Sequence, residues 1–174
     1  MDLWVLGNLA LSVVLLVGLQ YPLVRVAHLW HIAMCAYAGL RVIEVVAVNA
    51  LVLLDIQSSR KGPSKPPALG GHRRLLLLVA HNYVEVTLWF AFVYAAFSAH
   101  FSTSACNVSK PACATYFSAI TMATVGYGDV APTDDLGRAL VVAQVAVGVF
   151  LTVVILARVV GNLPQRPSLD PDEA

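Results

Sequence analysis

Charged residues are scarce in this chain of 174 residues. Asp, Glu, Lys and Arg make up 12% of it, whereas an average soluble domain contains about 25%. Apolar residues make up 59%. So little solvating charge is typical of membrane proteins, and the composition favours that class. The net charge is only +1, and no basic stripe is evident, so we expect no nucleic-acid partner.

Cysteine is also rare, with three residues in all. Cys35 lies in an apolar run, while Cys106 and Cys113 bracket one short polar segment. Three cysteines do not build a disulfide framework or a metal site. The histidines likewise show no spacing typical of metal ligands, and no nucleophile and base pair stands out. We therefore expect neither an enzyme nor an organic cofactor.

Long apolar stretches are what the chain does contain. A helix needs about 20 apolar residues to cross a bilayer. Four candidates are Leu3–Leu19, Leu29–Leu54, Leu75–Phe101 and Leu136–Val160. The first follows the acidic Asp2 and lacks the basic residues of a secretory signal, so we interpret it as a transmembrane helix, with a cleaved signal as the alternative.

The positions of basic residues predict the orientation of these spans. Residues 57–74 contain five of them: Arg60, Lys61, Lys65, Arg73 and Arg74. Such a segment is typical of the cytoplasmic side, so both termini are expected there and residues 100–137 outside. The chain then divides into two N-terminal helices (1–56), a basic loop (57–74), a membrane module (75–160) and a short tail (161–174).

The external segment has the pattern of a re-entrant loop. Residues 112–122 can form about three helical turns, and Gly126 and Gly128 interrupt the pattern that follows. Backbone of this kind is tolerated at membrane depth where protein buries it or where it lines an aqueous path. The pattern therefore indicates a pore.

Residues 121–129 read Thr-Met-Ala-Thr-Val-Gly-Tyr-Gly-Asp, and this run resembles the signature of tetrameric potassium channels. Its core hexapeptide would arise by chance in such a chain with a probability on the order of 10⁻⁵. The resemblance covers about residues 75–160. It implies an all-α membrane protein with four transmembrane helices per subunit, a pore helix and a selectivity filter, assembled as a homotetramer in membrane lipid.

The resemblance also assigns roles in the filter. Thr124, Val125, Gly126, Tyr127 and Gly128 would form it, with K⁺ held at the first four of these residues. Rings of backbone carbonyls can replace the water shell of K⁺. Glycine supports the required alternation of backbone handedness, because it adopts positive φ at little steric cost.

Two features beside the filter depart from the family pattern. Ala123 replaces a threonine, and Tyr116 and Phe117 stand where many members have paired tryptophans. Because a phenol can donate to a carboxylate, we predict that Tyr116 supports the filter through Asp129.

Acidic residues and cysteines mark the external side. Asp134 and Asp135 can concentrate cations at the mouth or cap the following helix. Cys106 and Cys113 share a short loop on the oxidising side, so we predict an intrachain disulfide, with free thiols or an intersubunit bridge as alternatives.

In the last span, Gly148 aligns with a gating glycine of the family. It is a candidate hinge, because glycine weakens a helix interior by about 1 kcal/mol relative to alanine. The alternative is a small residue that permits close helix approach, for which the outer helix is the expected neighbour. Thr152 and Ile155 are expected to face the cavity.

Only Arg41 carries a positive charge in the interior of a span, away from its ends, so the arginine repeat of a voltage sensor is absent. Charges at this depth usually pair, and we predict that Arg41 pairs with Glu44 or Glu85. The sequence as a whole predicts a passive potassium channel of the plasma (inner) membrane. The alternatives are a subunit of a potassium-uptake system or a non-conducting subunit with a pore-like fold.

Overall fold

The computed structural model describes residues 3–19, 28–59, 69–102 and 106–161. The regular elements are helices α1 (Leu3–Gly18), α3 (His28–Ser59), α4 (Leu69–Ala96), α5 (Pro111–Met122) and α6 (Asp135–Gly161), with the 3₁₀ turn η1 (Ser98–His100). Within these ranges there is no strand, only an isolated bridge between Phe101 and Pro132. The all-α fold expected from the sequence is confirmed.

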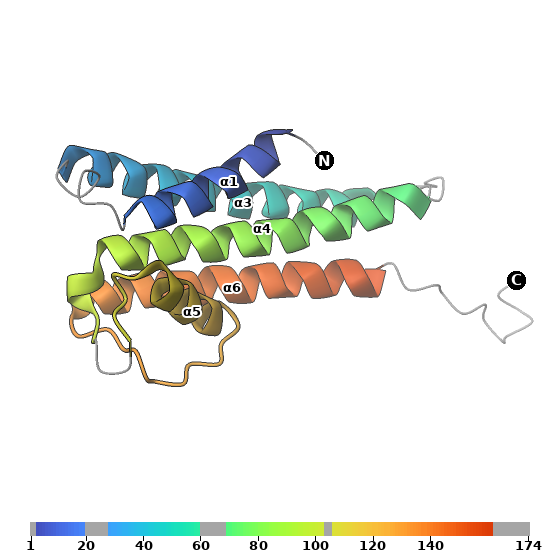
Figure 1. The fold of residues 1–174 in the computed structure, drawn as a ribbon. Helices are drawn as coiled ribbons and strands as arrows, with labels where there is room; N and C mark the ends of the chain where they lie inside the picture. The colour runs from blue at the N-terminus through green and yellow to red at the C-terminus, as the bar shows by residue number, and fades with distance from the viewer. Residues whose placement is uncertain (1–2, 20–27, 60–68, 103–105, 162–174) are drawn as a thin grey trace, which may run out of the picture.

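Helix α4 is the central element of the bundle. It contacts α1 and α3 on one side and α5 and α6 on the other, as Figure 1 shows. The short α5 lies at one end of the bundle, beside α4 and α6. The arrangement follows from the burial of α4 on several sides, since its side chains at 85–87, 89–92 and 94–95 are all buried and most of them are apolar.

Three helices are long and apolar enough to cross a membrane: Ile32–Leu51, Leu77–Ala96 and Asp135–Val160. The fourth expected span, α1, is only 16 residues long in the described part of the chain. A helix of that length rises about 24 Å, less than the roughly 30 Å of a hydrocarbon core. Three of the four expected spans are therefore confirmed, and α1 is a shorter apolar helix packed against α4.

The helices continue further toward the basic segment than the sequence indicated. Helix α3 ends at Ser59 and α4 begins at Leu69, so both extend into the segment 57–74 that was expected to form a loop. Nothing prevents a helix from continuing past the apolar core into water, where its polar residues are solvated. The predicted positions of Arg60, Lys61 and Lys65, and of the tail after Gly161, lie outside the described residues.

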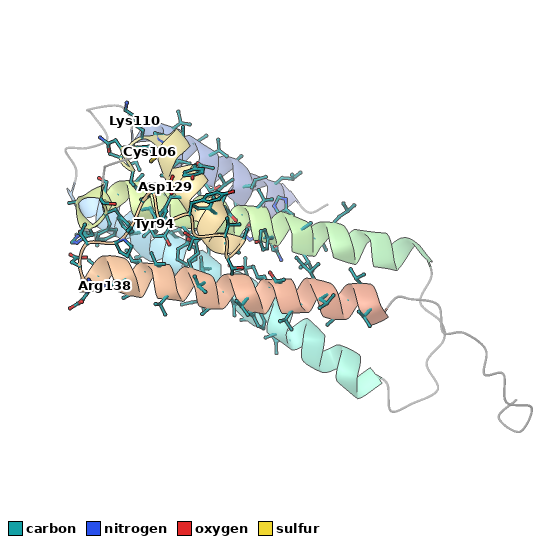
Figure 2. The ribbon with its side chains drawn as sticks, turned by 90° about the horizontal axis from the view of Figure 1, so that it is seen from below. Tyr94, Cys106, Lys110, Asp129 and Arg138 are labelled. Carbon is teal, nitrogen blue, oxygen red and sulfur yellow. A yellow bond between two sulfur atoms is a disulfide. The ribbon has the colours of Figure 1, made fainter. Side chains whose placement is uncertain are left out.

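An aromatic cluster holds α5 against the bundle. The rings of Tyr94 and Phe117 lie 4.9 Å apart, and Phe101 lies 5.1 Å from Tyr94 and 5.5 Å from Phe117. All three are buried. Figure 2 shows Tyr94 at the end of the bundle that also carries Cys106, Lys110, Asp129 and Arg138. Aromatic pairs at these distances stabilise beyond the burial of their area, so the cluster fixes the position of α5.

Candidate functional site

Helix α5 has well-defined ends. Pro111 occupies its first turn, where the missing N–H is not needed for an intrahelical bond, and Ala123 is the C-cap. The bounds Pro111–Met122 agree within one residue with the pore helix expected from the sequence. One face is buried against the bundle through Ala114, Phe117 and Ser118.

The candidate filter segment starts with a turn that closes the end of α5. Thr124 N–H donates to Thr121 O over 3.0 Å, and Val125 N–H donates to Ile120 O over 2.8 Å. These are the two bonds of a Schellman motif, in which the residue after the C-cap adopts positive φ. That residue is Thr124, with φ of 56°. Glycine usually occupies this position, so a β-branched residue here is a strained exception.

Positive φ then recurs at alternate residues. Gly126 has φ of 55° and Gly128 has φ of 77°, while Val125 and Tyr127 between them do not have positive φ. The side chains of Val125 and Tyr127 are 51% and 72% exposed in the single subunit. The backbone handedness thus alternates over residues 124–128, as the resemblance implied at the two glycines. The third position, Thr124, was not anticipated from the sequence.

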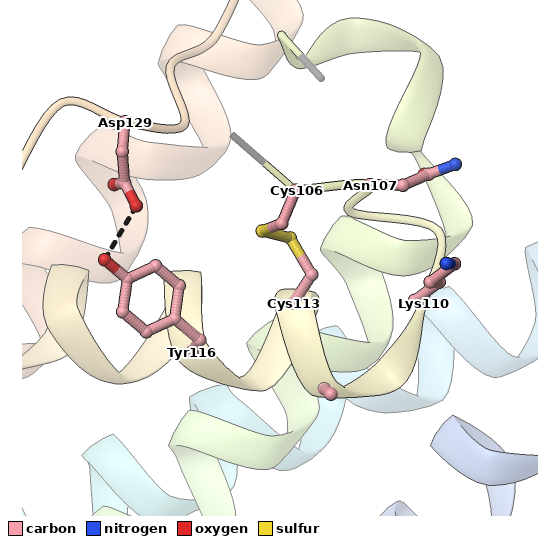
Figure 3. Close-up of a pocket in the computed structure, with 7 residues that line it drawn as sticks. Cys106, Asn107, Lys110, Cys113, Tyr116 and Asp129 are labelled. Carbon is pink, nitrogen blue, oxygen red and sulfur yellow. Dashed lines mark hydrogen bonds between the residues drawn. A yellow bond between two sulfur atoms is a disulfide. The ribbon is translucent and has the colours of Figure 1, made fainter. Parts of the chain in front are cut away.

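Tyr116 and Asp129 meet beside this segment. The Tyr116 hydroxyl donates a hydrogen bond to Asp129 Oδ2 over 2.7 Å, as Figure 3 shows. The bond to the carboxylate raises the pKa of Tyr116 above its usual value, because the neutral phenol is the form that donates. The segment after the filter is therefore tied back to the middle of α5.

A disulfide between Cys106 and Cys113, whose Cα atoms lie 6.0 Å apart, joins the segment before α5 to the first turn of that helix. Cys113 and Tyr116 are three residues apart, and both line one pocket of about 690 Å³ (Figure 3). Its remaining lining residues are Cys106, Asn107, Lys110, Ala112 and Asp129. Cys35 is a free cysteine of the described part.

The two acidic residues before α6 have different partners. Asp134 is the N-cap, since its Oδ1 accepts from Gly137 N–H over 2.9 Å. Its Oδ2 contacts His100 Nδ1, which links the turn η1 to the start of α6. The bond from Gly137, and then the one from His100, hold the pKa of Asp134 below its ordinary range. Asp135 forms an exposed ion pair with Arg138. The capping alternative therefore holds for Asp134.

Gly148 faces the end of α5 and not the outer helix. A Cβ built on it would lie 2.9 Å from Met122 O and 3.1 Å from Met122 Sδ. The nearest neighbour of Gly148 is therefore Met122 at the end of α5, whereas the outer helix was the neighbour expected from the sequence. The Thr152 hydroxyl donates to Gly148 O over 2.8 Å within α6. The structure supports close approach at Gly148, and the hinge stays a prediction.

Arg41 pairs with both predicted carboxylates, not with one of them. Its Nη2 lies 2.7 Å from Glu85 Oε1 on α4, and its Nη1 lies 2.6 Å from Glu44 Oε2 on its own helix. The guanidinium can serve both because its donors form a rigid fork. The pair to Glu85 joins α3 to the central helix in the buried interior.

The most extensive polar contact in the module was not anticipated. Gln144 on α6 is fully buried and hydrogen-bonds to Tyr94 on α4 and to Ser118 on α5. The available signal was a single amide in the otherwise apolar run 139–151. No group of three or more His, Cys, Asp or Glu that could hold a metal ion is found among the described residues.

The described residues form an all-α protein in which three helices are long and apolar enough to cross a membrane. Residues 83–163 match a family model described as "Ion channel". The matched stretch begins within α4 and includes α5, residues 124–128 and α6. No curated protein and no solved structure matches the chain.

Proposed function

We propose that this chain is the subunit of a homotetrameric channel that conducts K⁺ passively through a filter of backbone carbonyls at residues 124–128. The observation that carries the proposal is the alternation of positive φ at Thr124, Gly126 and Gly128. Alternating handedness turns successive carbonyls toward the same side of the segment. Four such segments around one axis would give the rings of oxygen that replace the hydration shell of K⁺.

The strain at Thr124 supports the same proposal. A β-branched residue at positive φ is costly, by about 1 kcal/mol or more, and glycine would avoid that cost. Strain of this kind tends to persist where a side chain is needed. In the proposed filter, the Thr124 hydroxyl supplies the innermost oxygen layer.

Assembly around an axis is supported by what the single subunit leaves uncovered. Val125 and Tyr127 are large apolar side chains, and both are exposed. Neighbouring copies would cover them in a tetramer, while membrane lipid would cover the exposed apolar side chains on the outer faces of α1 and α3. Cytoplasmic termini in the plasma (inner) membrane belong to the proposal, with residues 57–74 on the cytoplasmic side.

The test is ion flux through purified protein in liposomes without an energy source. We expect K⁺ flux, and under a K⁺/Na⁺ gradient we expect the current to reverse near the K⁺ equilibrium potential. Reversal near zero would indicate a non-selective pore. Flux that appears only with an energy source would favour an uptake system, and no flux under either condition would favour a non-conducting subunit.

A matched pair of glycine variants sharpens the test. Gly126→Ala places a side chain at φ of 55°, whereas Gly39→Ala lies in α3, and a Cβ added at either position would meet no atom within 4 Å. An added methyl group therefore has room at both positions, and the two positions differ in that only Gly126 has positive φ. We expect Gly126→Ala to abolish K⁺ current and Gly39→Ala to retain it. Equal currents in the two variants would contradict the proposed filter.

A further inference from the structure

The buried amide of Gln144 uses all of its hydrogen-bonding groups. Tyr94 Oη donates to Gln144 Oε1 over 2.6 Å. Gln144 Nε2 donates to Ser118 O over 2.9 Å and to Ser118 Oγ over 2.8 Å. Gln144 and Ser118 are both 0% exposed. One side chain of α6 is therefore bonded to both other helices that surround the candidate filter.

The hydrogen bonds continue from Ser118 to the end of α5. Ser118 Oγ donates to Thr87 O over 2.6 Å, and Thr87 Oγ1 donates to Tyr83 O over 2.8 Å. Tyr83 Oη in turn donates to Met122 O over 3.0 Å. Met122 is the last residue of α5, directly before the C-cap and the filter segment. This series of contacts begins at Gln144 on α6, passes through two residues of α4 and ends at Met122. At Thr87 and Tyr83 it continues through the covalent structure of the residue, because the group that accepts is not the group that donates.

Gly148 is a second point at which α6 contacts the end of α5, through its close approach to Met122. It lies four residues after Gln144, as Met122 lies four residues after Ser118, so two successive turns of α6 face two successive turns of α5. A Cβ at Gly148 would already be 2.9 Å from Met122 O, which leaves no slack at this contact. Directional hydrogen bonds hold the turn of α6 at Gln144, and close approach to Met122 holds the next turn at Gly148. The two contacts together fix the register of α5 and α6.

An apolar side chain at position 144 would fill the same space without burying an amide. Burial of polar groups is unfavourable unless every group is bonded, but a fully bonded network specifies one arrangement, because hydrogen bonds are directional. An amide here gives α6 a specific position relative to α5, which apolar contact alone would not define.

We propose that Gln144 is a positioning residue for the filter: it fixes α5 to α6, so that a movement of α6 changes the position of Met122 and of the filter segment that follows. The inference rests on the proposed function of K⁺ conduction, and it concerns how the state of α6 is communicated to the filter.

The first test replaces the amide by a side chain of similar size. Gln144→Met removes three hydrogen bonds while retaining volume, and we expect the mean open time of single channels to fall about fivefold, which corresponds to the loss of one net hydrogen bond. The matched control is Asn49→Leu. Asn49 is also a buried amide, but the bond that it forms among the described residues is to Val45 O within its own helix. We expect its open time to remain that of the wild type.

A purely structural role is distinguished by Gln144→Glu. A protonated carboxyl can accept from Tyr94 and donate one of the two bonds that the amide donates to Ser118, whereas the ionised form can only accept. We expect open times near those of the wild type at low pH and a fall as pH rises, a dependence that the wild type lacks. Open times of Gln144→Glu that follow the same pH profile as the wild type would overturn the proposal.

A second measurement does not depend on current. Hydrogen exchange of the amides of residues 119–128 in the assembled protein should be faster in Gln144→Met than in the wild type and in Asn49→Leu. If Gln144→Met does not assemble, the variant Tyr94→Phe/Ser118→Ala/Gln144→Met removes the unpaired partners as well and should show the same acceleration. Unchanged exchange in the assembled variant overturns the proposal. A wild type that conducts no K⁺ overturns the proposed function instead, and the exchange data still decide the role of Gln144.

Discussion

Arg41 and Glu85 form a buried ion pair that connects α3 to α4. Nη2 and Nε of Arg41 lie 2.7 Å and 3.2 Å from Glu85 Oε1, and the side chains are 6% and 0% exposed. Trp89 Nε1 donates to the same oxygen over 3.3 Å. Because charges at membrane depth are tolerated when paired, the contact gives α3 a specific attachment to α4.

Removing one partner of this pair should destabilise more than removing both. Arg41→Ala leaves Glu85 buried without its counter-charge, at a cost of about 3–5 kcal/mol, whereas Arg41→Met/Glu85→Leu leaves no unpaired charge. The measurement is thermal or denaturant unfolding of the assembled protein. Glu44→Gln is the control, since Glu44 is 51% exposed and should matter less. Purely additive losses in the double variant would show that the two residues act independently.

The hydrogen bond from Tyr116 to Asp129 predicts a role in keeping the filter conductive. Tyr116→Phe removes only the hydroxyl, and the loss of a bond to a carboxylate should shorten open-state lifetimes about tenfold. Single-channel recording measures the effect. Tyr37→Phe serves as the matched control, because its hydroxyl bonds to Asn8 on α1, away from the filter. Equal lifetimes in the two variants would argue against the predicted support.

The disulfide predicts a definite labelling pattern. When unreduced protein is treated with a thiol reagent and measured by mass spectrometry, Cys35 should be labelled after unfolding, while Cys106 and Cys113 should appear as one linked peptide pair. Cys106→Ser/Cys113→Ser should lower the free energy of unfolding by about 2 kcal/mol, as expected for a short closed loop. Labelling of both Cys106 and Cys113 without reduction would exclude the bond.

The contact at Gly148 predicts overpacking by even one methyl group. Gly148→Ala should displace Met122 and destabilise the assembled protein by about 1–3 kcal/mol, with lower tetramer yield. Gly39→Ala is the control, because its Cβ meets no atom within 4 Å and alanine favours the helix. A hinge gives a different result: normal yield and conductance with a lower open probability. Normal yield with unchanged gating would contradict both roles.

Asp134 predicts a pH dependence at the external end of α6. Its folded-state pKa lies below the ordinary value of 3.8, so its stabilising contribution is present above that pH and is lost as pH falls through the folded value. Asp134→Asn keeps the capping acceptor and should remove this part of the pH dependence of the melting temperature. Asp135→Asn is the control, with its side chain 99% exposed. An unchanged pH profile in Asp134→Asn would show that the cap does not titrate.

The local features of this protein could be predicted from its sequence. The apolar runs determined where three spanning helices form, and Pro111 and the glycines at 126 and 128 determined where α5 begins and where the backbone alternates. These are effects of side-chain hydrophobicity and backbone sterics within a few residues. The bounds of α1 agree with the apolar run Leu3–Leu19 within one residue, although a helix of this length is shorter than the spans formed by the other three.

The tertiary structure alone decided which distant groups meet. Arg41 and Glu85 are 44 residues apart, Ser118 and Gln144 are 26 apart, and Tyr94 and Gln144 are 50 apart. The sequence offered Arg41 two carboxylates and gave Gln144 no partner at all. Which groups pair depends on the rotation and register of helices that pack side by side, and these are set by the fit of whole helix faces, such as the contact of Gly148 with Met122. No local pattern in the chain encodes that fit, since it exists only once α4, α5 and α6 are in contact.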